Sequence, residues 1–572
     1  MPLPKLVPAD EQVLVQETAF SVDALARHVC STWGEATESG ASPFSVVVVG
    51  AGMYGGYLAA KIHRQHPGKR ILLLDAGRFL VSEHVQNLGR VGLGIPAPIP
   101  PGSDPGVARD LVWGLPWRGN VEFPGLAYCP GGKSLYWGGW CPRLTQSDLQ
   151  HWPASTGQYL SDNYLSVESE IGVKPSTDFI SGELYQALDA KLVAAGAATN
   201  NVEAGLGRSG VEEAPLAVQG ESPVSGLFSF DKYSSMPLLI DAIREDVASS
   251  GFQDADRRLF LVPLAHVIKV HASNGVAHTV EVDVAGQRQF LNIAPGCAVV
   301  FAASAIESTR LALHSFPTQL MGRNLMAHIR SDLTFRIHRS ALPTVASHVQ
   351  TAALLVRGVA PTGRFHIQVT ASTSRAGSDE LLFRMVPDLD LLDQQLANTD
   401  PDWVTVTMRA VGEMHGETGA PVPSADASWV NLSPHEADEF GVPRAYAQIV
   451  LGQQDAQTWQ AMDHTALALA QHVAGSPQAI EYFYDGTWQA QPFPLTRPFP
   501  EWHRGLGTTY HESGTLWMGD DPAASVTNAL GRFHGIQNAY ACDQSLFPTV
   551  GSVNPVLTGL TLARRLAEQL PP

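Results

Sequence analysis

Cysteine is scarce in this 572-residue sequence, and the few cysteines follow no recognisable pattern. There are five of them, an odd number, and no C-x-x-C pair occurs. The sequence therefore indicates neither a disulfide framework nor a zinc site. We expect a reducing compartment, the cytoplasm, and no metal-binding residues. The five are Cys30, Cys129, Cys141, Cys297 and Cys542.

Long apolar runs and runs of basic residues are missing too. The most apolar stretch, residues 46–60, is interrupted by four glycines and Tyr54 and is too short to cross a bilayer. The start of the chain, with Asp10 and Glu11, does not have the basic and then apolar pattern of a signal peptide. The net charge of -18 repels phosphate groups. We therefore expect no membrane span and no nucleic-acid partner.

Hydrophobic residues, glycine and proline are abundant, at 44% of the chain, 52 and 40 residues respectively. A chain of this length exceeds the size at which one hydrophobic core stops growing, which favours two domains. Residues 44–49 form a β-branched run typical of a strand buried on both faces, residues 53–64 have helical spacing, and residues 71–75 form a second apolar run. These three segments predict a βαβ unit.

The first turn of this unit is Gly50-Ala-Gly-Met-Tyr-Gly55, a G-x-G-x-x-G motif. The motif alone is weak evidence, but here a strand precedes it, a helix follows it, and the next strand ends in Asp75. Glycines allow a pyrophosphate to approach the backbone, and a carboxylate accepts hydrogen bonds from ribose hydroxyls. The pattern predicts a dinucleotide site. The alternative is a glycine-rich turn with a solvated Asp75.

The rest of the chain alternates strand and helix patterns. Asn554 is expected to cap a C-terminal helix with Pro555 in its first turn, and the helix should end near Leu570. Leucines at helical spacing give it an apolar stripe: Leu557, Leu560, Leu562, Leu566 and Leu570. The other expected elements are a helical N-terminal extension and loop over 1–44, an extended loop over 86–117, strands over 261–270, 280–290 and 298–303, a helix over 304–314, and a strand-rich region over 331–449.

Six segments resemble those of the glucose-methanol-choline oxidoreductases, and they occur in the order found in that family. The segment from Val46 to Gly77 resembles the family's FAD-binding start, although the strand-end acid there is more often Glu than Asp. The resemblance continues over 131–140, a glycine loop that contacts the flavin in the family, and over 298–310, 322–328, 511–519 and 551–558. Residues 340–500 resemble the family only loosely.

This resemblance implies the fold and its division. The fold class is α/β, or α+β overall, with a Rossmann-like FAD-binding domain and a second, strand-rich substrate-binding domain. The expected boundaries are an N-terminal extension over 1–44, a discontinuous FAD-binding domain over 45–155, 255–330 and 505–572, and a substrate-binding domain over 156–254 and 331–504.

The resemblance also implies an FAD cofactor and the residues that bind it. Some pyranose oxidases attach FAD through a histidine of the glycine loop, and Tyr136 stands at that position here, so we expect noncovalent FAD. The helix beginning at Pro555 would direct its positive dipole end at the flavin. For Asp543 the alternative is a capping acid. The cofactor-binding positions are Gly50, Gly52, Gly55, Asp75, Gly132, Ser134, Trp137, Gly138, Val267, Asp543 and Pro555.

Two residues of the C-terminal segments correspond to the family's catalytic pair, His511 and Asn554. A neutral imidazole can accept the hydroxyl proton of an alcohol, and an amide can donate to the oxygen as charge develops on it, while the hydride passes to flavin N5. The alternatives are a buried histidine that holds a loop and an asparagine that only caps a helix. We expect structural roles for His328, His503 and His534.

The substrate is predicted from residues 132–143, which look more like sugar-acting members of the family than choline- or methanol-acting ones. The expected reaction is pyranose oxidase-like: oxidation of a secondary alcohol of a sugar or glycoside, with O2 or a quinone-like compound as electron acceptor. The alternatives are a non-sugar alcohol, a flavin-containing lyase of the same fold, and a catalytically silent FAD-binding protein.

Overall fold

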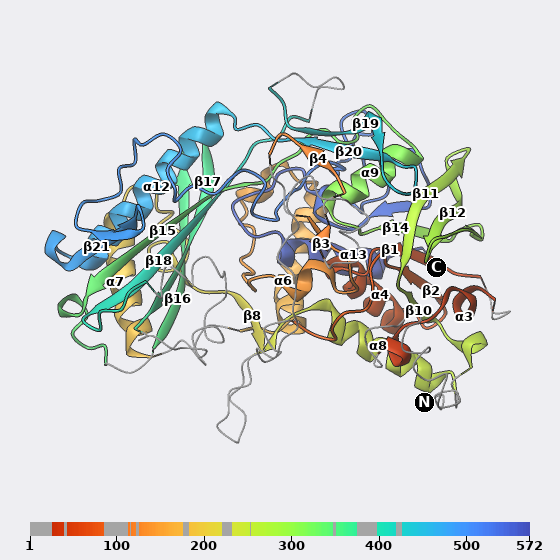
Figure 1. Cartoon of the computed structure of the whole chain (residues 1–572), viewed down its shortest axis with the longest axis horizontal. Helices are drawn as coiled ribbons and strands as arrows, with labels where there is room; N and C mark the ends of the chain where they lie inside the picture. Colours follow the sequence, from red (N-terminus) through yellow and green to blue (C-terminus); the bar gives the residue numbers. More distant parts are fainter. Residues whose placement is uncertain are drawn as a thin grey trace.

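The computed structural model describes residues 26–38, 43–84, 113–114, 116–121, 125–174, 182–219, 231–251, 253–346, 350–373, 397–418 and 426–571. Figure 1 shows two lobes, one with the N- and C-terminal elements and one with a large sheet of long strands. Most of the extension predicted over 1–44 and of the loop predicted over 86–117 lies outside the described residues. In the described part of the chain, no helix is both long and apolar enough to cross a membrane.

A five-stranded parallel sheet forms the centre of the first lobe. In chain order its strands lie 3-2-1-4-5, the arrangement of a doubly wound fold, so the predicted α/β class is confirmed. The direction of winding reverses beside the first strand, and ligands of such sheets bind at this point, beyond the carboxyl ends of the strands. The strands are β10 (Leu259–Val262), β2 (Ile71–Leu74), β1 (Val46–Val49), β14 (Ala298–Phe301) and β23 (Ala539–Ala541).

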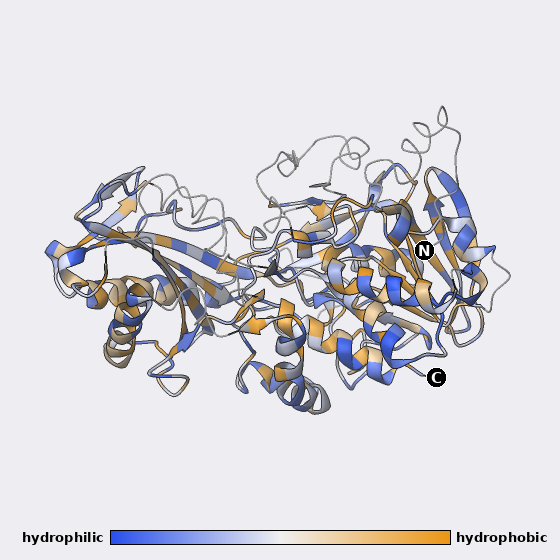
Figure 2. Ribbon diagram, turned by 90° about the horizontal axis from the view of Figure 1, so that it is seen from below, coloured by the Kyte–Doolittle hydropathy of each residue, from blue (hydrophilic) through white to orange (hydrophobic). Residues whose placement is uncertain are grey.

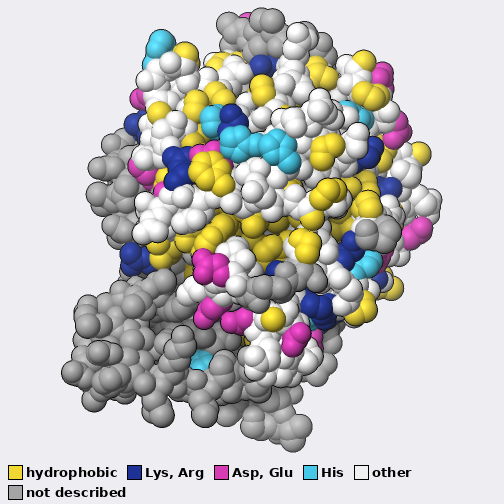
Figure 3. All heavy atoms as spheres, turned by 90° about the vertical axis from the view of Figure 1, so that its right-hand side faces the viewer, with side chains coloured by type: hydrophobic (Ala, Val, Ile, Leu, Met, Phe, Trp, Pro, Cys, Tyr) yellow, Lys and Arg dark blue, Asp and Glu magenta, His cyan; other side chains and the backbone are white. Residues whose placement is uncertain are grey.

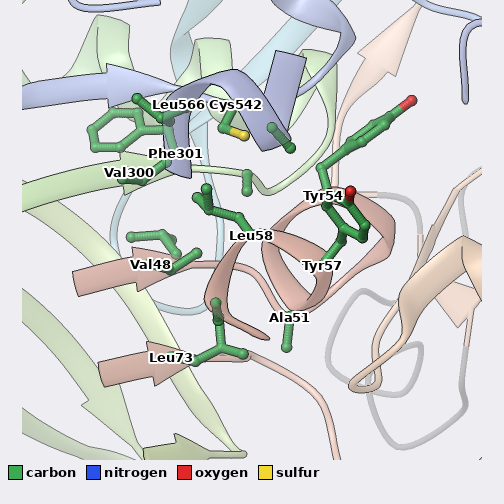
Figure 4. Packing of buried hydrophobic residues seen from close by; sticks show 14 of the residues in the cluster. Val48, Ala51, Tyr54, Tyr57, Leu58, Leu73, Val300, Phe301, Cys542 and Leu566 are labelled. Carbon is green, nitrogen blue, oxygen red and sulfur yellow. The ribbon is translucent and has the colours of Figure 1, made fainter. Parts of the chain in front are cut away.

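Helices cover this sheet because its strands are apolar on both faces. Leu73, Val48 and Val300 are in register across three strands, and Figure 4 shows them near Leu58 of the helix α4. The C-terminal helix begins and ends close to the predicted residues, and all five leucines of its stripe are buried. The α-helices described in this lobe are α2 (Ala26–Val29), α3 (Trp33–Thr37), α4 (Met53–Gln65), α6 (Ala154–Glu170), α8 (Ser235–Ser249), α9 (Ala305–Ser315) and α13 (Val556–Gln569).

Two of these helices, α6 and α8, come from the range predicted to belong to the substrate-binding domain. In the structure α8 packs against α4 and β10, and α6 packs against α13. Both helices therefore belong to the helical layers of the first lobe, around the five-stranded sheet. The domain boundaries themselves stay a prediction.

Two segments predicted as single strands are each divided in two. The range 261–270 contains the end of β10 and the start of β11 (Ala265–Ser273), separated where Leu264 adopts a positive φ of 52°. The range 280–290 is a hairpin of β12 (Val276–Val284) and β13 (Gln287–Asn292). Its turn residues, Ala285 and Gly286, both have positive φ, as a two-residue hairpin turn requires. Pro263 stands beside the first break and Gly286 in the second, so each segment contains a residue typical of turns.

A seven-stranded, antiparallel sheet dominates the second lobe, which confirms the strand-rich region predicted over 331–449. The long helix α12 (Gln453–Ala474), which was not predicted, lies along it. A further helix, α7 (Glu183–Ala198), packs against α12 and the sheet edge. The strands in sheet order are β22 (Thr487–Gln489), β21 (Ile480–Tyr484), β15 (His328–His338), β18 (Trp403–Glu413), β17 (Gly363–Ser372), β16 (Thr351–Ala360) and β7 (Val211–Glu213).

The two faces of this large sheet differ in polarity although both are buried. In β17, Phe365, Ile367 and Val369 pack in one apolar cluster with residues of α12. The residues between them, His366 and Gln368, point to the opposite face because side chains alternate along a strand. Figure 2 shows this alternation as hydrophilic and hydrophobic bands along the long strands. A buried polar face is unusual, because each polar group there needs a hydrogen-bond partner.

On the face of the molecule shown in Figure 3, the described basic side chains are scattered among acidic ones.

Smaller sheets join the lobes and line their edges. One small sheet, built from β19, β20 and β4, packs against α9. The remaining strands are β3 (Trp113–Gly114), β4 (Arg118–Gly119), β5 (Leu126–Ala127), β6 (Val173–Lys174), β8 (Leu216–Gln219), β9 (Asp231–Lys232), β19 (Trp429–Ala437) and β20 (Pro443–Gln448).

Candidate active site

The three glycines of the first turn have three different surroundings. Gly50 has a φ of 97°, and a Cβ there would lie 2.6 Å from the carbonyl oxygen of Ala302. A Cβ on Gly55 would lie 1.9 Å from the carbonyl oxygen of Gly50, so α4 packs directly on the turn. A Cβ on Gly52 would meet no heavy atom within 4 Å. Tight turn, close packing and open approach are the three roles of glycine in a dinucleotide-binding fingerprint, and the turn therefore fits a pyrophosphate.

The second glycine loop lies against the first one at the same edge of the sheet. Gly131 N donates to Ala51 O at 2.7 Å, and a Cβ on Gly132 would lie 3.2 Å from Gly52 Cα. Gly52 is also the N-cap of α4, where no side chain caps the helix. The first backbone N–H groups of a helix have no partner within the helix and favour anions. The two loops and the helix end therefore converge at the predicted pyrophosphate position.

Asp75 is buried directly beyond β2, so it is not the solvated residue of the alternative interpretation. Its Oδ2 accepts from Ala51 N and its Oδ1 from Gly77 N, both at 2.9 Å. Burial raises the pKa of this carboxyl to about 6, and the two N–H groups act in the opposite direction. Each carboxylate oxygen has a second lone pair, so a ribose hydroxyl could still donate to it.

The next three predicted residues lie in or just after the short helix η2 (Gly132–Leu135). Ser134 Oγ donates to Gly131 O at 2.6 Å and accepts from Ser235 N at 3.2 Å. Trp137 Nε1 donates to Tyr233 O at 2.6 Å, and Gly138 follows it in an irregular segment. These hydrogen bonds hold the loop against the start of α8. Contacts of the three residues with FAD stay predictions.

Asp543 and Val267 occupy different parts of the same lobe. Asp543 Oδ2 accepts from Ser308 Oγ at 2.5 Å, and Oδ1 accepts from Ser545 N at 2.9 Å, which caps the short helix η7 (Gln544–Leu546). Asp543 therefore caps a helix, which is the alternative role considered for it, and its contact with a cofactor stays a prediction. Burial raises the pKa of its carboxyl. Val267 is buried in β11, a strand joined to Asp75 O by Ala265 N at 2.8 Å.

The structure brings the predicted catalytic residues together. His511 Nε2 and Asn554 Nδ2 are 3.4 Å apart, and both residues remain partly exposed. The expectation that Asn554 caps the C-terminal helix is wrong, because Pro555 is the N-cap of α13 and no side chain caps it. The Asn554 side chain turns toward the second lobe, where its Oδ1 accepts from Gln368 Nε2 at 2.9 Å.

His511 is neutral at neutral pH. Burial lowers the pKa of its imidazole well below the ordinary 6.5, and the neighbouring His328 and His366, Arg330 and Lys133 lower it further. A neutral imidazole is the form that accepts a proton. Tyr510, directly before it, has a φ of 61°, a conformation uncommon for a residue with a side chain.

Three further polar residues support this pair and were not among the predicted site residues. His328 Nδ1 is 2.8 Å from His511 Nδ1, so the structural role expected for His328 is a contact with the predicted base. His366 Nε2 and Gln368 Nε2 are 3.0 Å apart beneath Asn554. The available signal was the alternation of apolar and polar residues in 365–369, which places both on the polar face of a buried strand.

No group of three or more His, Cys, Asp or Glu side chains that could hold a metal ion occurs among the residues that the structure describes.

Comparison with known proteins gives three kinds of match. The model of the GMC oxidoreductase family matches residues 423–563, which include His511 and Asn554. Paromamine 6'-oxidase of Streptomyces fradiae is 43% identical over 58 residues, and 6'''-hydroxyparomomycin C oxidase of Streptomyces lividus is 42% identical over 64 residues. Each match covers 10% of this chain, and the matched segments span 11% and 12% of these two relatives.

A comparison of structures gives a match over a much larger part of the chain than the sequence matches do. The crystal structure of pyridoxine 4-oxidase from Mesorbium loti superposes with a TM-score of 0.53 and covers 92% of this chain and 99% of that protein. The sequence identity is 15%, so this likeness concerns the fold.

Proposed function

The chain belongs to the glucose-methanol-choline (GMC) oxidoreductase family, and from this premise we propose that it is an FAD-dependent enzyme that oxidises an alcohol to a carbonyl compound. The observation that carries the proposal is a neutral His511 beside Asn554 at 3.4 Å. This pair can receive a hydroxyl proton and stabilise the oxygen that loses it.

The residues at the edge of the five-stranded sheet fit FAD. The open approach at Gly52 and the uncapped start of α4 would receive the pyrophosphate, and the Asp75 carboxylate would accept from a ribose hydroxyl. Tyr136, in place of a linking histidine, supports noncovalent binding. FAD, when bound, supplies the acceptor for the hydride that leaves the alcohol carbon.

The protein side chains would accept the hydroxyl proton and stabilise the negative charge that develops on the alcohol oxygen. The alcohol O–H donates to His511 Nε2, which removes the proton, while Asn554 Nδ2 donates to the same oxygen as it becomes negative. The start of α13 at Pro555 has no side-chain cap, and its positive dipole end favours negative charge nearby by about 0.3 to 1 kcal/mol, or about 2 kcal/mol when partly buried.

We further propose that the substrate is a pyranose, free or in a glycoside, oxidised at a secondary alcohol, with O2 or a quinone-like acceptor and a cytoplasmic location. The sugar part of the proposal is supported by the loop over 132–143 and by the names of the two Streptomyces relatives, paromamine 6'-oxidase and 6'''-hydroxyparomomycin C oxidase. Since these names specify 6' and 6''' positions, the exocyclic 6-hydroxyl must be tested beside the ring hydroxyls.

The test is an anaerobic substrate screen that follows the flavin spectrum. The panel contains hexopyranoses, their methyl glycosides, 6-deoxy analogues, paromamine, pyridoxine, choline and small aliphatic alcohols. Bleaching by a pyranose and by its 6-deoxy analogue supports oxidation at the ring. Bleaching only by non-sugar alcohols contradicts the sugar assignment, and an unbleached flavin throughout contradicts the oxidoreductase, as a lyase or a silent FAD-binding protein would predict.

A further inference from the structure

Beneath the predicted catalytic pair lies a chain of hydrogen bonds that ends on two consecutive peptide carbonyls, those of Gly551 and Ser552. We propose that His328, His366 and Gln368 are positioning residues. They hold His511 as the tautomer whose Nε2 is bare, that is, carries no proton, and they hold the Asn554 amide with its N–H groups toward that nitrogen. The inference rests on the proposed function for its catalytic meaning, but the protonation pattern is a property of the chain itself.

The first arm of the network fixes the tautomer of His511. His328 Nε2 is 3.0 Å from Gly551 O, and a carbonyl oxygen only accepts, so this nitrogen carries the proton. Burial lowers the pKa of His328 to about 4, so the ring is neutral and its Nδ1 is an acceptor. His511 Nδ1, 2.8 Å away, must then be the donor. The remaining nitrogen of His511, Nε2, is therefore bare and faces Asn554.

The second arm fixes the orientation of the Asn554 amide. His366 Nδ1 donates to the carbonyl oxygen of Ser552, so in the neutral ring Nε2 is an acceptor. Burial lowers the pKa of His366 to about 3, which keeps the ring neutral. Gln368 Nε2 donates one hydrogen to His366 Nε2 at 3.0 Å and the other to Asn554 Oδ1 at 2.9 Å. A flipped Asn554 would place two N–H donors against each other, so Nδ2 is directed at His511.

The burial of the network agrees with a positioning role. His328, Gln368 and His366 are 1%, 2% and 0% exposed, whereas His511 and Asn554 keep partly exposed surfaces. The three positioning residues are thus buried, whereas the two side chains that would contact a substrate are partly exposed to solvent.

Both carbonyl anchors are themselves held in place. They lie in the loop that leads into Asn554 and α13, and Ser552 N donates to Asp148 Oδ1 at 3.2 Å. The supporting side chains come from the other lobe, on β15 and β17. The network therefore couples the polar face of the large sheet to the pair, and it determines the protonation of His511 and the orientation of Asn554 from fixed backbone atoms.

The tautomer of His511 is tested directly by 15N NMR of protein labelled at histidine, with FAD bound. We compare the wild type with His328→Leu, which removes the acceptor, and His328→Gln, which restores an acceptor and a donor. His511→Gln identifies the resonances. We expect a protonated Nδ1 and a bare Nε2 in the wild type and in His328→Gln, and a mixture of tautomers in His328→Leu. A bare Nε2 of unchanged population in His328→Leu would overturn the first arm.

The same variants are compared in single-turnover flavin reduction with whichever alcohol bleaches the wild type. His328→Leu should lower the limiting rate by about 10- to 100-fold, the scale known for losing the hydrogen-bond partner that orients a metal-bound histidine, with a much smaller change in substrate affinity. His328→Gln should recover most of the rate. His534→Leu is the matched control and should react as the wild type does, because His534 lies in the first lobe beside β23 and its ring is hydrogen-bonded to Ser525.

The second arm is tested with a double-mutant cycle. If Gln368 acts only through Asn554, then Gln368→Leu lowers the limiting rate and adds no further loss to Asn554→Ala. Independent, multiplicative losses would overturn the second arm. If no alcohol reduces the wild-type flavin, the proposed function fails, but the NMR comparison still decides whether His328 sets the tautomer of His511.

Discussion

Alanine substitutions at Gly52 and Gly55 separate a cofactor-binding turn from a turn that is only structural. In the protein alone, a Cβ at Gly52 meets no heavy atom within 4 Å, whereas one at Gly55 would lie 1.9 Å from a backbone oxygen. Gly52→Ala should therefore leave the apoprotein folded, with a cost of about 1 kcal/mol for a poorer N-cap residue. Gly55→Ala must displace α4 from the turn and should strongly destabilise the protein.

Gly52→Ala, which should leave the apoprotein folded, should nevertheless weaken FAD binding. If the pyrophosphate lies against Gly52, an added methyl group overpacks that contact at about 1 to 3 kcal/mol, which raises the Kd for FAD by about 5- to 150-fold. The assay is titration of the apoprotein with FAD, followed by flavin fluorescence, together with thermal unfolding of each apoprotein. Gly68→Ala, another glycine whose Cβ would meet nothing within 4 Å, is the matched control and should change neither quantity. Wild-type affinity for FAD in Gly52→Ala would refute the assignment of this turn.

Three further predictions concern the cofactor and pH. Because Tyr136 replaces a linking histidine, acid precipitation should release the yellow flavin into the supernatant; flavin retained in the pellet would contradict noncovalent binding. Because the pKa of His511 lies well below 6.5, the rate of flavin reduction should stay constant as the pH falls from 8 to 6.5 and decline only below that, when the base becomes protonated; a decline centred at or above 6.5 would contradict this. His328 has a folded pKa of about 4 against an ordinary 6.5, so the unfolded state takes up its proton first and stability is lost as the pH falls through this window. The urea midpoint should therefore fall less steeply with acid in His328→Gln than in the wild type, and equal slopes would argue against a neutral buried His328.

The five-stranded sheet and its glycine turn, where FAD is proposed to bind, could be predicted because their requirements are local. Val46–Val49, the glycine turn and Asp75 follow one another within 30 residues, and each has a direct steric or hydrogen-bonding reason. The breaks at Leu264 and at Ala285 were missed although Pro263 and Gly286 stand beside them, because the residues on either side are equally typical of one continuous strand.

The contacts that support the predicted catalytic pair could not be predicted, for a different reason. Asn554 looked like a helix cap because Pro555 follows it, and only the packing of β17 shows where its amide points. Gln368 is 186 residues away from it in sequence, in a region that resembles the family loosely. Contacts at such separation depend on how the two lobes meet, and no local pattern encodes that.

The central claim is that His511 removes the proton of an alcohol while the flavin is reduced. It is tested most directly by anaerobic stopped-flow reduction of the flavin in the wild type and in His511→Ala, with an alcohol that bleaches the wild type. We predict that His511→Ala still binds FAD and that its limiting rate falls by about 100-fold or more, the scale expected for a lost general base. A His511→Ala protein that reduces its flavin at the wild-type rate would contradict the account.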